Sequence, residues 1–210
     1  MRTLRVGGMT PLTTIDYPGE LAAVVFCQGC PWRCRYCHNP ELLDRKAPTL
    51  NDWDAVLDFL RRRIGLLDAV VFSGGEPTAQ SALSSAMETV TDLGFHIGLH
   101  TAGSYPERLE KLLPRVNWVG LDVKALPDDY PRLTGVDGSG ERAWKSLALL
   151  AESGLEFQVR ITRHPALLPD LAMQGLLQRL RGYGVDQPTI QPCRTQSVLD
   201  PSLSDLAALP

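Results

Sequence analysis

The chain has 210 residues, of which 44% are hydrophobic and 21% are charged, a balance typical of a globular protein with a sizeable core. Its formal net charge of −3 gives no overall attraction to nucleic acid. No apolar run approaches the roughly 18 residues that a membrane span needs, and no signal-peptide pattern follows Met1. We therefore expect one soluble, cytoplasmic domain over residues 1–210, without a nucleic-acid or membrane partner.

The predicted strands follow an opening segment, residues 1–20, that lacks helical spacing and predicts an irregular or hairpin lead-in. Short apolar runs rich in β-branched and aromatic residues then recur along the chain and predict six strands. These runs are residues 21–26, 69–72, 95–100, 117–123, 156–161 and 188–192.

Helical patterns lie between most of these runs. The first pattern is an apolar stripe at positions i, i+3, i+4, i+7 and i+11: Trp53, Val56, Leu57, Leu60 and Ile64. Asn51 or Asp52 is its expected N-cap. A shorter segment ends before Pro114, and further stripes span residues 144–151 and 173–180. The turn-rich stretch 126–141 predicts a surface loop.

Alternation of strands and helices predicts a parallel sheet, because right-handed crossovers return each strand beside its predecessor. About six units fit this length, whereas a full eight-unit barrel needs about 250 residues. The sequence therefore favours an α/β fold built as an open, partial (βα)6 TIM-like barrel. A doubly wound sheet is the alternative, since periodicity does not reveal whether a sheet curls.

The most distinctive stretches follow the first four predicted helix-connected strands. They are "CQGCPWRCRYCHNP", "SGGEPT", "HTAGSYP" and "DVKALP". In both α/β architectures the carboxyl ends of the strands carry the chemistry, so these stretches are expected to form one site.

Four of the five cysteines lie within residues 27–37. Because a reducing cytosol disfavours disulfides, the cluster indicates metal binding or catalysis. Two C-x2-C pairs are typical of zinc sites, but only three residues separate these pairs. A four-thiolate electron-transfer cluster is a second interpretation, although the spacing differs from the ferredoxin run.

The third interpretation uses Cys30-x3-Cys34-x2-Cys37, in which three thiolates hold three irons of a 4Fe–4S cube and leave one iron open. Cys27, at the end of the first predicted strand, is then a small buried hydrophobe. Basic side chains within the loop, at residues 33 and 35, are expected to favour the thiolate forms of the ligands.

The cysteine triad, with Ser73-Gly74-Gly75-Glu76-Pro77 after the second strand, resembles the radical S-adenosylmethionine (SAM) superfamily, whose members carry C-x3-C-x2-C and GGEP motifs on a partial (βα)6 barrel. Within that superfamily the chain resembles the activating enzymes of glycyl-radical enzymes over most of residues 10–165. It is most similar to the anaerobic ribonucleoside-triphosphate reductase activating proteins. This narrower resemblance is carried by "TTIDYPGELAAVVFCQGCPWRCRYCHNPEL", "FSGGEPTAQ", "HTAGSYP" and "WVGLDVKALPDDYPRLTG".

The resemblance implies an anaerobic oxidoreductase that holds a 4Fe–4S cluster and S-adenosyl-L-methionine. A low-potential donor such as flavodoxin or ferredoxin would supply one electron, and the product would be a glycyl radical on a partner subunit, anaerobic ribonucleotide reductase. Pyruvate formate-lyase-type activation is an alternative, since those enzymes share much of the pattern. Two further alternatives are a small-molecule enzyme resembling 7-carboxy-7-deazaguanine synthase and a non-enzymatic zinc-binding module.

The same resemblance implies that Cys30, Cys34 and Cys37 ligate the cluster. It also implies cofactor-binding roles for eight further residues: Tyr36, Gly74, Gly75, Glu76, Thr101, Asp122, Lys124 and Arg160. Tyr36 would contact adenine, the Gly-Gly-Glu-Pro segment the ammonium, and Lys124 the methionine carboxylate. Alternative interpretations exist for four of these residues. Tyr36 could pack in the core, Asp122 and Lys124 could form a salt bridge with each other, and Arg160 could make an ion pair at the edge of the core.

The roles of three further residues are less well defined. His100 stands where many activating enzymes have the aspartate of D-T-N-G, so binding of a monovalent cation is in doubt and a structural histidine is expected. The sequence assigns no role to His38, which follows the cysteine triad, or to Cys193.

Overall fold

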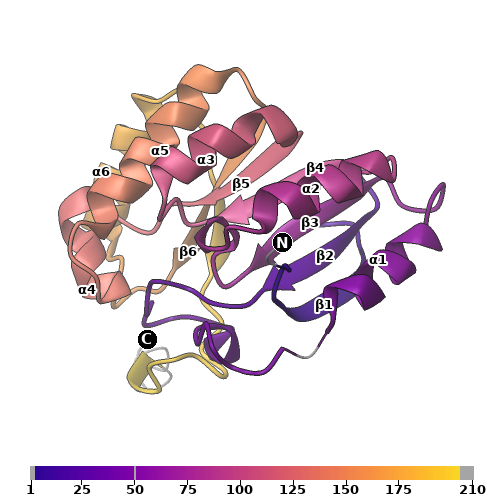
Figure 1. Ribbon diagram of the computed structural model, residues 1–210. Coiled ribbons are helices and arrows are strands. Elements are labelled where there is room, and N and C mark those ends of the chain that lie inside the picture. The colour runs from indigo at the N-terminus through magenta and orange to yellow at the C-terminus, as the bar shows by residue number, and fades with distance from the viewer. Residues whose placement is uncertain (1–2, 50, 204–210) are drawn as a thin grey trace.

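One seven-stranded sheet forms the centre of the structure, a computed structural model that describes residues 3–49 and 51–203 (Figure 1). The strands lie in sequential order, and only β1 runs antiparallel to its neighbour. The strands are β1 (Val6–Thr13), β2 (Ala22–Cys27), β3 (Ala69–Gly74), β4 (His96–Thr101), β5 (Trp118–Asp122), β6 (Phe157–Arg163) and β7 (Thr189–Pro192).

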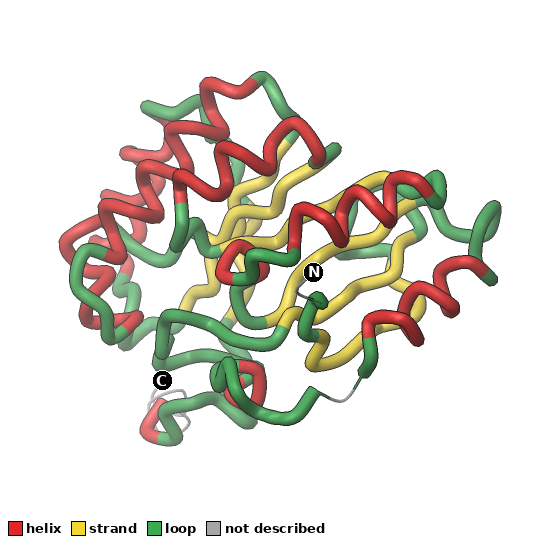
Figure 2. Tube along the Cα trace, viewed as in Figure 1, coloured by secondary structure: helices red, strands yellow, loops and turns green. Residues whose placement is uncertain are grey.

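The six predicted strands are all present, as β2 to β7, and β1 forms a hairpin with β2. Because the order never reverses, successive right-handed crossovers place the helices on one face of the sheet. A doubly wound sheet requires a reversal of strand order and is therefore not the architecture. The sheet is not closed, which confirms the expected partial barrel, and Figure 2 shows the helices along its outer side.

Four α-helices match predicted helical segments: α1 (Trp53–Arg61), α3 (Pro106–Leu112), α5 (Ser139–Ser153) and α6 (Asp170–Arg181). Helix α2 (Leu83–Asp92) was not predicted from the sequence, and α4 (Tyr130–Thr134) lies in the predicted surface loop. Short 3₁₀ turns complete the set: η1 (Pro40–Leu42), η2 (Pro77–Ala79), η3 (Leu113–Arg115) and η4 (Pro127–Asp129). Asp52 caps α1 by accepting a hydrogen bond from the amide of Asp54. The expected place of Ile64 in the stripe is wrong, because α1 ends at Arg61 and the chain turns through Gly65, leaving Ile64 56% exposed.

The predicted surface loop at residues 126–141 is also wrong. It contains η4, α4 and the start of α5, and Tyr130 and Leu133 are fully buried. Its turn-forming residues serve as helix ends: a proline begins η4 and another lies in the first turn of α4, while Gly135 ends α4 in the left-handed conformation. This segment therefore supports the cysteine loop instead of extending into solvent.

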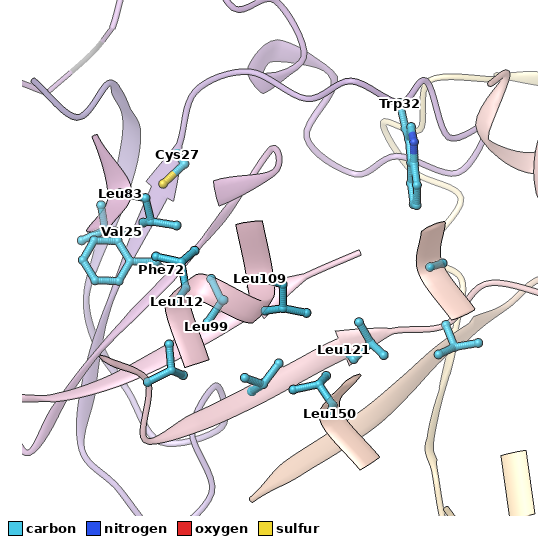
Figure 3. Packing of buried hydrophobic residues seen from close by; sticks show 14 of the residues in the cluster. Val25, Cys27, Trp32, Phe72, Leu83, Leu99, Leu109, Leu112, Leu121 and Leu150 are labelled. Carbon is cyan, nitrogen blue, oxygen red and sulfur yellow. The ribbon is translucent and has the colours of Figure 1, made fainter. Parts of the chain in front are cut away.

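The two faces of the sheet pack differently. On β2, Val25 and Cys27 point toward the helices, and Figure 3 shows Cys27 beside Val25 and Leu83. The opposite, inner face is closed near the start of the strands by Tyr17, whose ring stacks on Trp118 at 5.2 Å. A hollow therefore remains at the carboxyl ends of the strands, above this stacked pair. Within the described part of the chain, no helix is long and apolar enough to cross a membrane.

Candidate active site

A cavity at the carboxyl ends of the strands brings the four distinctive stretches together. Ten of the eleven side chains or backbone positions predicted for the site line it: Cys30, Cys34, Tyr36, Cys37, Gly74, Gly75, Thr101, Asp122, Lys124 and Arg160. The register of the parallel strands explains this convergence, because β2 ends beside β3 at Cys27 and Gly74, and β5 ends beside β6 at Asp122 and Arg160.

The cysteine loop between β2 and η1 is held from both sides. The amides of Arg33 and Arg35 donate to the carbonyls of Thr134 and Leu133 on α4, at 2.9 and 3.0 Å. On the other side, the carbonyls of Arg35 and Cys37 accept hydrogen bonds from a segment after β7, residues 193–203, which we call the strap. Two segments distant in sequence thus fix the backbone that carries Cys34 and Cys37.

The strap contacts are specific. The amides of Leu199 and Asp200 donate to the cysteine loop at 3.2 and 2.9 Å, and the Asp200 carboxylate pairs with the Arg35 guanidinium at 2.7 Å. His38, which lines the cavity, is 2.8 Å from the carbonyl of Arg194 through Nε2. Figure 1 shows the yellow strap beside the purple loops near the C-terminal end.

The three thiols lie in an environment that favours protonation in the absence of a metal. Burial raises the pKa of Cys30 to about 12 and raises the pKa values of Cys34 and Cys37, while the Lys124 ammonium lowers all three. Ligation must therefore displace the thiol protons. Within the described residues, no three His, Cys, Asp or Glu side chains are close enough together to hold a single metal ion.

The expectation that both loop arginines stabilise the thiolates is wrong. Arg35 is paired with Asp200, and the Arg33 guanidinium donates to the backbone carbonyl of Cys30 at 2.8 Å. Arg33 lowers the pKa of Cys37 only as the smallest of several influences. The cation common to all three thiols is Lys124, which reaches the cavity from the end of β5.

Lys124 and Tyr36 form a buried pair in the cavity wall. The Lys124 ammonium lies 5.6 Å from the centre of the Tyr36 ring, and the two residues are 8% and 5% exposed. Burial alone would lower the pKa of Lys124, but the ionised forms of Tyr36 and Cys34 and the Asp122 carboxylate outweigh it and raise the pKa well above its usual value. Among the described residues, no carboxylate lies within ion-pair distance of this ammonium.

The Tyr36 hydroxyl is buried without a hydrogen-bond partner in the described part of the protein. An unpartnered buried hydroxyl costs about 1–3 kcal/mol. Together with the unpaired ammonium of Lys124, it fits a wall that receives a polar, negatively charged group. The residues present therefore suit a ligand with a carboxylate.

A network of Asp122, Arg160 and His100 forms another part of the cavity wall. The Arg160 guanidinium contacts Asp122 Oδ1 at 2.9 Å and His100 Nδ1 at 3.0 Å, and His100 Nε2 lies 2.8 Å from the carbonyl of Asp16. Burial, and then the charge of Arg160, lower the pKa of His100 to about 4, so the imidazole is neutral at pH 7. Burial would raise the pKa of Asp122, but Arg160 and then Lys124 lower it, so Asp122 is ionised. Arg160 thus lines the cavity and also makes the ion pair that the sequence left as its alternative.

The glycines of the SGGEP segment allow two backbones to touch. Gly74 has φ +107°, and a Cβ there would lie 2.4 Å from the Cys27 amide nitrogen. A Cβ on Gly75 would lie 2.5 Å from the carbonyl oxygen of Gly29. Any side chain at either position would push the cysteine loop away from β3.

Glu76 is the predicted residue that does not line the cavity. Its carboxylate is fully buried and accepts hydrogen bonds from the Thr78 amide, the Thr101 hydroxyl and the Ala102 amide at 3.1, 2.7 and 3.0 Å. These donors, from η2 and the loop after β4, surround the carboxylate, so Glu76 positions Thr101 and Ala102. Contact between the Gly-Gly-Glu-Pro segment and the ligand stays a prediction.

Several lining residues were missed in the sequence. Ser73 precedes the two glycines, and Thr162 is two positions beyond Arg160 on β6, so it faces the same side of the sheet. Period-two reasoning could have found Thr162. Trp32 gave no such signal, because its ring is buried by an edge contact with Tyr130, a residue almost one hundred positions away.

The family description "Radical SAM superfamily" matches residues 24–170. The chain therefore belongs to this superfamily and is an enzyme. This finding contradicts the alternative interpretation of the protein as a non-enzymatic zinc-binding module. Members of the superfamily use a 4Fe–4S cluster and S-adenosylmethionine, and these are the cofactors of this chain.

Similar sequences among known proteins indicate which group within the superfamily the chain resembles. The chain is 29% identical over 194 residues to the "Putative glycyl-radical enzyme activating enzyme MJ1227" of Methanocaldococcus jannaschii, covering 87% of this chain and 79% of that protein. It is 31% identical over 170 residues to the pyruvate formate-lyase-activating enzyme of Clostridium pasteurianum, covering 78% and 70%. The chain is thus a homologue of the activating enzymes of glycyl-radical enzymes.

Solved structures share the fold. SuiB of Streptococcus suis bound to its precursor peptide SuiA superposes with a TM-score of 0.66 at 15% identity, over 87% of this chain and 44% of SuiB. The protein anSMEcpe with bound AdoMet gives 0.61 at 17% identity, over 84% and 55%. The chain spans about half the length of these two structures, and the likeness supports the partial barrel.

Proposed function

We propose that this enzyme generates a glycyl radical on a partner protein and that the partner is anaerobic ribonucleoside-triphosphate reductase. The observation that carries the proposal is the single cavity in which the cysteine triad, Lys124 and the Asp122–Arg160 pair meet in a homologue of activating enzymes. The reductase is favoured by the sequence around "TTIDYPG", whose Tyr17 builds the floor of the hollow. The cytoplasm is the proposed location.

In this proposal Cys30, Cys34 and Cys37 would hold the cluster, which when bound and reduced would supply the one electron needed to cleave S-adenosylmethionine to methionine and a 5′-deoxyadenosyl radical. The unpaired Lys124 ammonium binds the methionine carboxylate. Its low-dielectric surroundings strengthen that contact.

The other wall residues orient the nucleoside and amino groups. Tyr36 offers a flat ring for adenine, and Gly74 and Gly75 let the backbone approach the ammonium closely. Asp122 and Thr101 add acceptors toward the same ligand, and Arg160 holds Asp122 in place. Buried apolar side chains around the cavity, such as Trp32 and Leu43, exclude water from the reacting atoms.

The open side of the sheet suits a protein substrate. Since β1 and β7 do not pair, the hollow above the Tyr17–Trp118 floor is not enclosed by strands. A loop that carries one glycine can approach through this opening, and the partner then completes the enclosure.

Electron paramagnetic resonance on the anaerobically reconstituted and reduced protein tests the proposal. The protein is mixed with S-adenosylmethionine and the large reductase subunit, and 5′-deoxyadenosine is assayed in the same tube. We expect a glycyl doublet on the subunit that is lost in Cys34→Ala and kept in the matched variant Cys27→Ala, because Cys27 packs in the core. Deoxyadenosine without the doublet would overturn the reductase assignment.

Pyruvate formate-lyase is the second candidate partner. The 31% identity to the activating enzyme of Clostridium pasteurianum favours it. The same assay with pyruvate formate-lyase in place of the reductase separates the two, since only the true partner gives the doublet.

A further inference from the structure

A second hollow, which we call the arginine groove, lies beside the candidate active site. Its charged and amide lining consists of Arg5, Gln28, Arg45, Gln80 and Arg108. The Gln80 amide group ties the groove together, since it accepts from the Arg5 amide at 2.9 Å and donates to the carbonyls of Arg5 and Gln28 at 2.8 and 3.1 Å. The groove is therefore a built feature of the fold.

The groove concentrates positive charge on a protein whose net charge is −3. No Asp or Glu is among the described residues that line it, and none of its arginines has an ion-pair partner there. Arg108 is held by the carbonyls of Thr78 and Ala79 at 3.0 and 2.9 Å, and Arg5 by the carbonyl of Ala47. Neutral carbonyls fix these cations in place and leave their charge available to a partner.

Only a thin layer of backbone separates the groove from the cavity. Gln28 lines the groove, and Cys30, two residues further on, lines the cavity. Between them Gly29 has φ +97°, and a Cβ there would lie 2.6 Å from Cγ of Arg45, so this arginine packs directly on the glycine backbone. Gly75 packs against the other side of this segment, since a Cβ added to Gly75 would collide with the carbonyl oxygen of Gly29.

We propose that the arginine groove docks a small acidic protein that carries one electron, and that the electron crosses the Gln28–Cys30 segment to the cluster. The inference rests on the proposed function, which requires one electron from outside. The carrier loses one electron and the cluster gains it, while no bond forms and no proton moves. The interfaces of electron-transfer complexes are small and their affinities are weak, and charge complementarity between the partners raises the rate of encounter. The fixed arginines of the groove would provide this complementarity to an acidic carrier.

A binding titration with an acidic flavodoxin as the probe tests the groove. Arg45→Glu is the first variant, because the guanidinium of Arg45 makes no hydrogen bond or ion pair with the described residues and the fold should persist. At low salt we expect its dissociation constant to rise about tenfold, and the difference to shrink at about 0.3 M salt. The control is Arg62→Glu, a charge reversal at an exposed position at the end of α1, at the opposite end of the strands.

The rate of cluster reduction, followed by the loss of visible absorbance, is the second readout. Reduced flavodoxin should reduce the Arg45→Glu enzyme more slowly than the wild type, whereas dithionite, which needs no docking site, should reduce both equally. The double variant Arg5→Gln/Arg108→Gln should behave like Arg45→Glu. Two results would overturn the proposed docking of the carrier in the groove. One is equal dissociation constants for wild type, Arg45→Glu and Arg62→Glu, and the other is the absence of salt-sensitive binding to the wild type.

The two proposals fail in different ways. If dithionite with S-adenosylmethionine yields no deoxyadenosine from the wild type, the proposed function is wrong, whatever flavodoxin does. If dithionite supports deoxyadenosine formation and charge reversal leaves flavodoxin binding unchanged, only the docking surface is wrong.

Discussion

Lys124 is a buried cation without a carboxylate partner, and this is the feature of the site with the clearest energetic consequence. We expect Lys124→Gln to weaken binding of S-adenosylmethionine about 10- to 100-fold, because a hydrogen bond to a charged group contributes about 1.5–3 kcal/mol. Equilibrium binding to the reconstituted protein measures this. Lys145→Gln, which removes an exposed ammonium paired with Glu107, should leave the affinity unchanged. An unchanged affinity in Lys124→Gln would assign the carboxylate to another residue.

Glu76 shows that a motif residue can act through its neighbours. Because its carboxylate accepts from donors on η2 and on the loop after β4, Glu76→Gln would turn an amide NH2 toward at least one of them. We expect the free energy of unfolding to fall by about 1–3 kcal/mol, as for a buried donor that loses its acceptor. Urea unfolding of the apoprotein measures it. Glu88→Gln, on the exposed face of α2, is the matched control, and an equal effect in both would contradict this role of Glu76.

The strap is the element whose role is least visible in the sequence. Its Asp200 pairs with Arg35 across 165 positions, and its backbone supports the loop of Cys34 and Cys37. We expect Asp200→Ala to retain about half or less of the wild-type iron after reconstitution and desalting, because metal affinity depends on how outer residues hold the ligands. Iron and sulfide analysis measures the loss.

The control for the strap is Asp58→Ala, which removes an exposed ion pair with Arg61 on α1. That variant should bind iron as the wild type does. Conservative Asp200→Glu should restore part of the iron content, since a carboxylate remains available to Arg35. Full iron content in Asp200→Ala, with unaltered electron paramagnetic resonance of the reduced cluster, would show that α4 alone holds the loop.

Elements with a clear period were predictable from the sequence, and elements defined by distant contacts were not. The strands β2 to β7 and helices α1, α5 and α6 follow from apolar spacing, and ten of the eleven site positions follow from motifs at strand ends. Residues 126–141 were misread because Pro and Gly are equally typical of loops and of helix ends. The strap and the burial of Glu76 depend on partners that no local pattern encodes.

At the scale of the whole molecule, the sequential strand order decides between architectures that periodicity leaves open. One hydrophobic cluster extends from Leu4 to Leu203 and joins both ends of the described chain to the helix-covered face of the sheet. The inner face adds a smaller cluster around Trp118. From this continuity we expect that the sheet, its helices and the strap form one cooperative unit.

We therefore expect the apoprotein to unfold in urea in a single transition. Far-ultraviolet circular dichroism and tryptophan fluorescence should give the same midpoint and slope, because Trp32, Trp53, Trp118 and Trp144 are all buried in parts of these two clusters. Trp118→Phe removes the reporter of the inner face, and the remaining fluorescence should still follow the same transition. A fluorescence transition that separates from the dichroism in the wild type and merges with it in Trp118→Phe would mean that the inner face opens first. The floor of the cavity would then be a separate unit of stability, and the view of one cooperative domain would be wrong.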